Sequence, residues 1–200
     1  MPIILISVLV ALLSSYGSSV NIIEPLTFLK IDLGSFQNGY ANFYSLENTY
    51  YLYNEWWRLA SPMFIHFSFT HLVFNCLWIY VLGSKIELYD GHITFLNLVT
   101  FSSIIANLAQ YFFGGSILFG GLSGVIYGLL GYCMIIQFEY KKNIYDLPPA
   151  IYMFMLIWLI FGFLGVLNLF GFGNVANFAH LGGLISGIIF AMITTIFKKA

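Results

Sequence analysis

Charged residues are scarce in this chain. Of its 200 residues only 8% are Asp, Glu, Lys or Arg, whereas soluble globular domains carry about 25%. Hydrophobic residues make up 60% of the chain, and the mean hydropathy is +0.89. This composition excludes a soluble globular domain and indicates a polytopic membrane protein. The net charge of -1 also argues against a nucleic-acid partner, which needs a basic face.

Cysteine is scarce as well. Cys76 and Cys133 are the only two cysteines, and both fall inside predicted membrane spans, where packing is a more frequent role than a disulfide. The four histidines are scattered, and no carboxylate lies near them within a span. The sequence therefore predicts neither a metal site nor a cofactor.

Apolar stretches of about 20 residues, the length that a membrane helix needs, recur along the chain. They predict an all-α membrane protein, a single domain over residues 1–200 that forms a six-transmembrane-helix bundle. The spans run approximately over residues 2–20, 63–83, 93–113, 123–140, 150–168 and 177–197. The first lacks a basic leader and is long for a signal-peptide core, so we expect it to be retained.

Basic residues predict the orientation. Five of the seven follow the second, fourth and sixth spans, as Lys85, Lys141, Lys142, Lys198 and Lys199. The positive-inside bias places those loops in the cytoplasm. The connection over residues 21–62 then lies outside, and its length and many aromatic residues predict a folded segment in the outer interface.

The fourth span begins with a serine among glycines. In FGGLSGVIYG, Ser123 stands 14 residues before Gln137, about 21 Å of helix, while the hydrocarbon is about 30 Å thick. Residues 114–122 are thus expected to descend into the membrane as irregular backbone beside a water-filled pocket, aided by Gly120 and Gly121. The alternative is an inert serine whose hydroxyl bonds to its own helix.

The sixth span carries His180 in the stretch ANFAHLGGLISG. Gly183, Gly187 and Ala191 lie on its helical face, and Gly124 and Gly128 form a matching stripe on the serine helix. Small residues let helices approach closely, although such stripes are often only packing. Here the approach would pair Ser123 with His180 as nucleophile and base, with Tyr127 against the imidazole ring.

The second span supplies further polar groups. In HFSFTHLVFN, His71 and Asn75 share one helical face and are candidate oxyanion donors. The alternative is that they bond only to each other or to a neighbouring helix. His66 is interpreted as a structural or interfacial histidine, and His92 as solvated surface.

Together these motifs resemble those of the rhomboid intramembrane serine protease family over residues 55–190. The resemblance rests on the Trp57-Arg58 pair, the spacing of His66, His71 and Asn75, and the stretches GLSGVIYG, AHLGGLISG and LGSKIE, the last with Glu87 at an acidic position. A GxSG word alone is weak evidence. Ordered motifs on four separate elements of the chain are strong evidence.

The resemblance implies a function. It assigns Ser123 as nucleophile, His180 as general base and later acid, and His71 and Asn75 as oxyanion donors. Arg58 and the Trp57 segment would belong to a membrane-embedded loop, and Tyr127, Gly121, Gly124, Gly183, Gly187 and His66 would support the site.

The expected substrates are the transmembrane segments of membrane proteins within the lipid bilayer, cut near the outer face. The resemblance also implies small residues at the cut, and a bacterial inner membrane with the active site opening to the periplasm. The alternative is a non-catalytic rhomboid-like protein that binds membrane-protein clients. A transporter is disfavoured because charged groups are missing from the spans.

Overall fold

The computed structural model describes residues 1–37, 40–140, 143–169 and 175–199. The fold is mostly helical, as predicted, and the described part of the chain also has one small antiparallel sheet. The all-α prediction was therefore wrong in the long connection, which contains both strands. Lys141 and Lys142 are two of the residues on which the predicted orientation depends. They lie outside the described residues.

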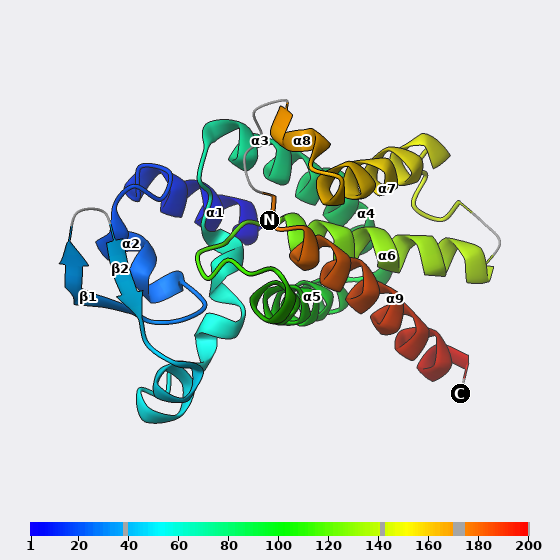
Figure 1. The fold of residues 1–200 in the computed structure, drawn as a ribbon. Coiled ribbons are helices and arrows are strands. Elements are labelled where there is room, and N and C mark those ends of the chain that lie inside the picture. Colours follow the sequence, from blue (N-terminus) through cyan, green and yellow to red (C-terminus); the bar gives the residue numbers. More distant parts are fainter. Residues whose placement is uncertain (38–39, 141–142, 170–174, 200) are drawn as a thin grey trace. The chain divides into compact units, whose positions relative to one another are not determined.

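The elements follow one another along the chain (Figure 1). They are α1 (Pro2–Leu13), α2 (Val20–Ile23), η1 (Glu24–Leu26), β1 (Ile31–Gln37), β2 (Tyr40–Phe43), η2 (Asn48–Leu52), η3 (Trp56–Leu59), η4 (Ser61–Phe64), α3 (Phe69–Trp78), η5 (Ile79–Gly83), α4 (Ser84–Asp90), α5 (His92–Phe113), α6 (Ser123–Tyr140), α7 (Pro149–Phe163), α8 (Val166–Leu169) and α9 (Asn177–Lys199).

The chain forms two compact units. The first unit comprises Met1–Leu77 and Ser116–Leu122, and the second comprises Trp78–Gly115 and Ser123–Ala200. The first unit thus holds α1, the long connection and most of α3. The second holds the remaining helices.

The second unit is organised around α6 and α9, which lie side by side in Figure 1, with α5 against α9. A Cβ atom at Gly183 would overlap the carbonyl oxygen of Gly124, and one at Gly187 would overlap that of Gly128. The two backbones are therefore in direct contact, and no side chain separates them. The small-residue stripes predicted from the sequence are confirmed as the contact between these helices.

The first unit folds the long connection, as predicted. Its strands pair with Ile31 opposite Phe43. Behind them the buried ring of Phe28 packs against Tyr50, whose hydroxyl donates to the Phe28 carbonyl at 2.8 Å. These contacts make the connection a folded segment rather than a free linker, while its place in the outer interface stays a prediction.

Three helices among the described residues are long and apolar enough to cross a membrane: Phe69–Asp90, His92–Phe113 and Asn177–Ile196. Three shorter apolar helices accompany them, Pro2–Leu13, Ser123–Glu139 and Pro149–Phe163. The protein is thus an integral membrane protein by composition and helix length. The count of six crossings stays a prediction.

Several helices do not share the bounds of the predicted spans, which stay a prediction for the membrane crossings themselves. The second predicted span begins six residues late in the structure, at Phe69, and continues to Asp90, so Lys85 and Glu87 lie in a helix rather than in a loop. The fifth ends at Phe163 because Gly165 adopts a φ of +73°, which breaks the helix before Val166. Hydropathy does not detect such stops, because the residues on both sides are apolar.

Candidate active site

Ser123 is the first residue of α6. The preceding residues 114–122 form neither helix nor strand, as predicted. Gly121 has a φ of +118°, a backbone conformation that residues with a side chain rarely adopt. Because the helix starts at Ser123, no helical carbonyl lies four residues before it. The inert serine that bonds to its own helix is therefore not the arrangement found here.

His180 lies in the first turn of α9, and its ring reaches Ser123. The distance between His180 Nε2 and Ser123 Oγ is 2.8 Å, and the His180 side chain is buried. The direct backbone contact between Gly124 and Gly183, one residue after Ser123 and three after His180, holds the two helix starts at this separation. With Nε2 unprotonated, the serine hydroxyl donates to it, and this is the geometry that nucleophilic catalysis by a serine requires.

Tyr127 fixes the orientation of the imidazole. Its ring stacks on His180 with centroids 4.7 Å apart and planes inclined by 26°. The Tyr127 hydroxyl in turn donates to the carbonyl of Met155 on α7 at 2.8 Å. A buried ring anchored at its far end gives the histidine a flat surface to rest on, in agreement with the contact predicted from the sequence.

His71 and Asn75 lie in the first unit, where both side chains face Gly121. A Cβ atom at Gly121 would stand 2.6 Å from His71 Nε2 and 3.2 Å from Asn75 Nδ2. Asn75 is buried, and its amide nitrogen has no hydrogen-bond partner within the described ranges. A buried donor without an acceptor is costly, so this amide is available to an oxygen that arrives from outside the chain.

The other two histidines differ from each other. His66 is fully buried; its Nδ1 lies 3.2 Å from the carbonyl of Phe64, and its ring centroid lies 4.9 Å from that of His71. His92 is exposed, as predicted, and pairs with Glu87. In the part of the chain that the structure describes, no group of three His, Cys, Asp or Glu side chains could hold a metal ion.

Arg58 is the centre of an ion-pair network in the first unit. Its buried guanidinium binds the carboxylates of Glu24 at 2.7 Å and Glu55 at 2.5 Å, and donates to the backbone carbonyls of Glu24 and Thr27. Burial alone would raise the pKa of Glu55, but hydrogen bonds from Lys30 and Arg58 outweigh it and hold the pKa below its usual value. All three guanidinium nitrogens thus bind groups of this segment and stabilise its fold.

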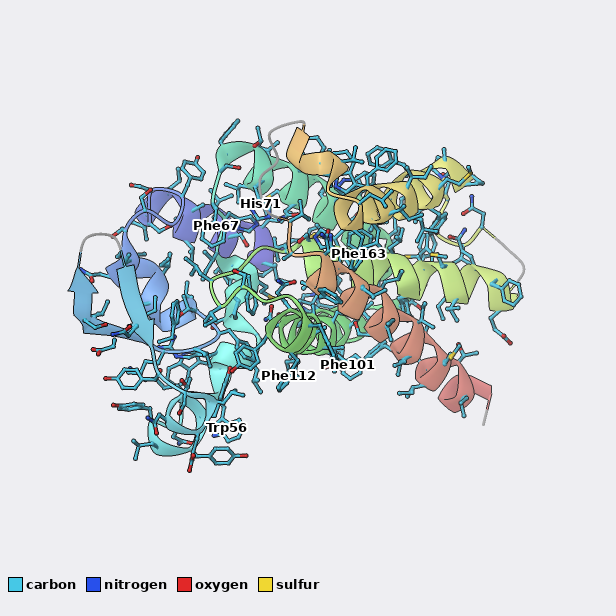
Figure 2. The ribbon with its side chains drawn as sticks, viewed as in Figure 1. Trp56, Phe67, His71, Phe101, Phe112 and Phe163 are labelled. Carbon is cyan, nitrogen blue, oxygen red and sulfur yellow. The ribbon has the colours of Figure 1, made fainter. Side chains whose placement is uncertain are left out.

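Trp57 completes this segment. Its indole Nε1 donates to the carbonyl of Pro25 at 3.0 Å, while 54% of the residue stays exposed. Figure 2 shows the neighbouring Trp56 among aromatic side chains of the same segment, and the rings of Tyr50 and Tyr51 pack on it. The polar atoms of these indoles are satisfied internally, which leaves their apolar faces outward.

Comparison with known proteins decides the family. Residues 53–197, well over half of the chain, match a family model described as the rhomboid domain. The chain belongs to the rhomboid family. The matched range begins before Trp57 and includes both Ser123 and His180.

Relatives of the rhomboid family that resemble the chain include the rhomboid protease GlpG of Serratia proteamaculans (strain 568), which is 36% identical over 143 residues. The proteins of the same name from Yersinia pseudotuberculosis serotype I (strain IP32953) and Yersinia pestis (strain Pestoides F) have the same identity over the same length. Each match covers 72% of this chain and 50% of the relative. The chain thus spans about half the length of the curated relatives that it matches.

One polar residue near the Ser123–His180 pair was missed by the sequence analysis of this rhomboid. Gln110 lies near the end of α5, is buried, and accepts a hydrogen bond from the backbone amide of Ala179, the neighbour of His180. A signal was present, because an uncharged polar side chain in an apolar span needs a partner inside the protein. The partner itself, a backbone amide 69 residues away, could not be read from the sequence.

Proposed function

We propose that this rhomboid is a serine endopeptidase that cuts peptide bonds in or near the transmembrane segments of other membrane proteins. The observation that carries the proposal is the contact of 2.8 Å between Ser123 Oγ and His180 Nε2. The relatives named rhomboid protease support the same activity.

The dyad provides the nucleophile and the base. His180 Nε2 takes the proton of Ser123 while Oγ attacks the carbonyl carbon of the scissile bond. The protonated histidine then gives that proton to the leaving amine, and an acyl-enzyme remains on Ser123. A water molecule, deprotonated by His180, hydrolyses the ester and restores the free serine.

The tetrahedral intermediates need donors for their oxyanion. We assign this role to the side chains of His71 and Asn75 and to the backbone amide of Ser123. The first two face Gly121, which precedes Ser123 by two residues in the chain, and the Asn75 amide has no partner within the described segments. Donors of this kind stabilise the transition state because the negative charge develops where they already point.

Supporting residues hold this arrangement. Tyr127 orients the imidazole of His180 by stacking, and the contact of Gly124 with Gly183 keeps the two helix starts together. Gly187 continues that contact one turn further along α9. His66, buried beside His71, supports the ring of the proposed oxyanion donor.

A fluorophosphonate probe tests the dyad. Purified protein in mild detergent, with the probe at high concentration and long exposure, should become labelled at Ser123, because only a serine beside a base attacks phosphorus. Cleavage of several model transmembrane substrates in liposomes should accompany the labelling. Ser123→Ala should abolish both, and His180→Ala should reduce both steeply while the melting temperature stays near that of the unmodified chain.

The competing function is that of a non-catalytic rhomboid-like protein that holds membrane-protein clients. A folded protein that neither labels nor cleaves any of the substrates would favour it and would refute the protease.

Orientation is tested separately. We propose that the protein lies in a bacterial inner membrane with Ser123 open to the periplasmic side, since five of the seven basic residues follow the second, fourth and sixth predicted spans. Reporter fusions after residues 90 and 145 should read cytoplasmic, and a fusion near residue 45 should read external. A cytoplasmic reporter at residue 45 would contradict the proposed opening.

A further inference from the structure

The first turn of α9 lacks an ordinary cap. The helix begins at Asn177, so Ala176 stands at the position before the first turn. Ser, Thr, Asp or Asn usually occupies that position and accepts a hydrogen bond from the second or third amide of the helix. Alanine has no side-chain acceptor, so the amide of Ala179, the third helical residue, needs an acceptor from elsewhere.

Gln110 supplies that acceptor from another helix. The Ala179 amide donates to Gln110 Oε1 at 3.1 Å, and only 4% of Gln110 is exposed. The carboxamide lies against Gly114, where an added Cβ atom would come within 2.5 Å of the Gln110 side-chain carbonyl carbon. The glycine that ends α5 thus makes room for a side chain that turns toward α9.

Other contacts hold the start of α9. The Ala179 carbonyl oxygen would lie 3.3 Å from a Cβ atom at Gly124 on α6, and in the next turn a Cβ atom at Gly182 would lie 2.6 Å from that of Ala109 on α5. The first turn of α9 therefore lies close to α6, and the second turn lies close to α5. Packing of small residues restricts the distance between helices, while the Gln110 bond restricts the rotation and fraying of the first turn.

We propose that Gln110 is a positioning residue: it caps α9 from α5 and so keeps His180 Nε2 within hydrogen-bond reach of Ser123. This inference rests on the proposed dyad. His180 directly follows the capped residue, so fraying of the turn moves the imidazole, and a misplacement of about 1 Å at a reacting group can cost about 100-fold in rate.

The test removes the acceptor and then returns it from a different residue. Gln110→Met keeps the length and volume of the side chain but cannot accept the bond. Ala176→Ser and Ala176→Asp, each combined with Gln110→Met, place an acceptor at the ordinary capping position of the same turn. Gln137→Met is the matched control, because it makes the same chemical change far from the site, near the end of α6 opposite to Ser123. There Gln137 bonds to Asn143 and Tyr152.

We expect Gln110→Met to lower kcat by about 10- to 100-fold, with KM unchanged within about twofold because Gln110 is not assigned to substrate. Hydrogen exchange of the Ala179 amide should become faster in the same variant. Ala176→Ser or Ala176→Asp should restore both the slow exchange and most of kcat. Gln137→Met should change neither quantity.

Three outcomes would overturn the inference. One is unchanged kcat and unchanged exchange in Gln110→Met. Another is a loss that neither substitution at Ala176 restores, because that pattern indicates lost packing rather than a lost cap. If Gln110→Met fails to fold, Gln110→Asn, which shortens the side chain by one methylene, replaces it. The third outcome is unaltered hydrogen exchange of the Ala179 amide in Gln110→Asn.

The exchange measurement separates this inference from the proposed function. Unmodified protein that is folded but inactive refutes the protease. The exchange rate of the Ala179 amide still reports whether Gln110 caps α9.

Discussion

Each of the two units of this rhomboid is stabilised by a different kind of internal contact. In the second unit, α6 and α9 meet through glycines whose backbones touch, and the contact contains no charge. In the first unit, the segment from Glu24 to Arg58 is irregular and is held by buried ion pairs and backbone carbonyls. The glycine contact tolerates no added atom, whereas the ion-pair network depends on the buried guanidinium of Arg58.

The difference has consequences for the proposed chemistry. The proposed nucleophile and base, Ser123 and His180, lie at helix starts, where backbone contact sets the spacing of their side chains. The proposed side-chain donors of the oxyanion hole lie in the same unit as the ion-pair network. Substitutions in the glycine contact and in the ion-pair network should therefore differ in how much they lower stability relative to activity.

Arg58→Met should have the largest effect. It removes the buried cation of the network and leaves Glu24 and Glu55 with Lys30 alone. Removing one partner of a buried pair costs about 3–5 kcal/mol, and Lys30 offsets part of this loss. Denaturant unfolding in detergent measures this loss. Lys30→Met is the control, because Lys30 is the more exposed cation of the same network, and a pair of that kind contributes only about 0–1 kcal/mol. Equal losses in the two variants would contradict the central role of Arg58.

Asn75→Ala tests chemistry rather than folding. Removal of one oxyanion donor typically lowers kcat by about 100- to 1,000-fold, and we expect measurable proteolysis to remain because other donors are present. The melting temperature should hardly change, since the Asn75 amide nitrogen has no partner among the described residues to lose. Full activity on several substrates would make Asn75 a structural residue.

Gly183→Val should damage stability and activity together. The added side chain would overlap the carbonyl of Gly124, and overpacking commonly costs about 1–3 kcal/mol. Because the same contact spaces Ser123 and His180, turnover should fall as well. Met192→Val, at an exposed position of α9, introduces a branched side chain without a close neighbour and should change neither. An unchanged melting temperature in Gly183→Val would refute the proposed role of the contact.

Acid should weaken the first unit by a smaller amount. Since the pKa of Glu55 is lowered in the folded protein, its contribution to stability is complete above the unfolded pKa of about 4.3 and is lost as the pH falls through the folded value. The melting temperature should thus decrease below about pH 4, and Glu55→Gln should flatten that decrease. Glu47→Gln, at an exposed carboxylate of the same segment, is the control. An identical slope in Glu55→Gln would show that another group causes the loss.

Much of the site was predictable because membrane sequences make polar residues conspicuous. Ser123 and His180 stand out in apolar spans, and glycines at helical spacing predicted which faces meet. The start of α6 at Ser123 followed from the polar residues at its other end. Gln110 was missed although it is equally conspicuous, because its partner is a backbone amide, and every residue except proline has one.

The sequence by itself determined the membrane class, the family and the pair of residues that carry the proposed chemistry, since these depend on composition and on spacing within single helices. Only the tertiary structure decided the ion pair of Arg58 with Glu24 and the capping of α9 by Gln110. Both join groups far apart in the chain whose pairing has no local signature, whereas the strands Ile31–Gln37 and Tyr40–Phe43 are separated by Asn38-Gly39, a dipeptide that favours a hairpin turn and that the sequence analysis overlooked. Hydropathy records how much a residue favours lipid, but it does not record which distant donor will meet which acceptor.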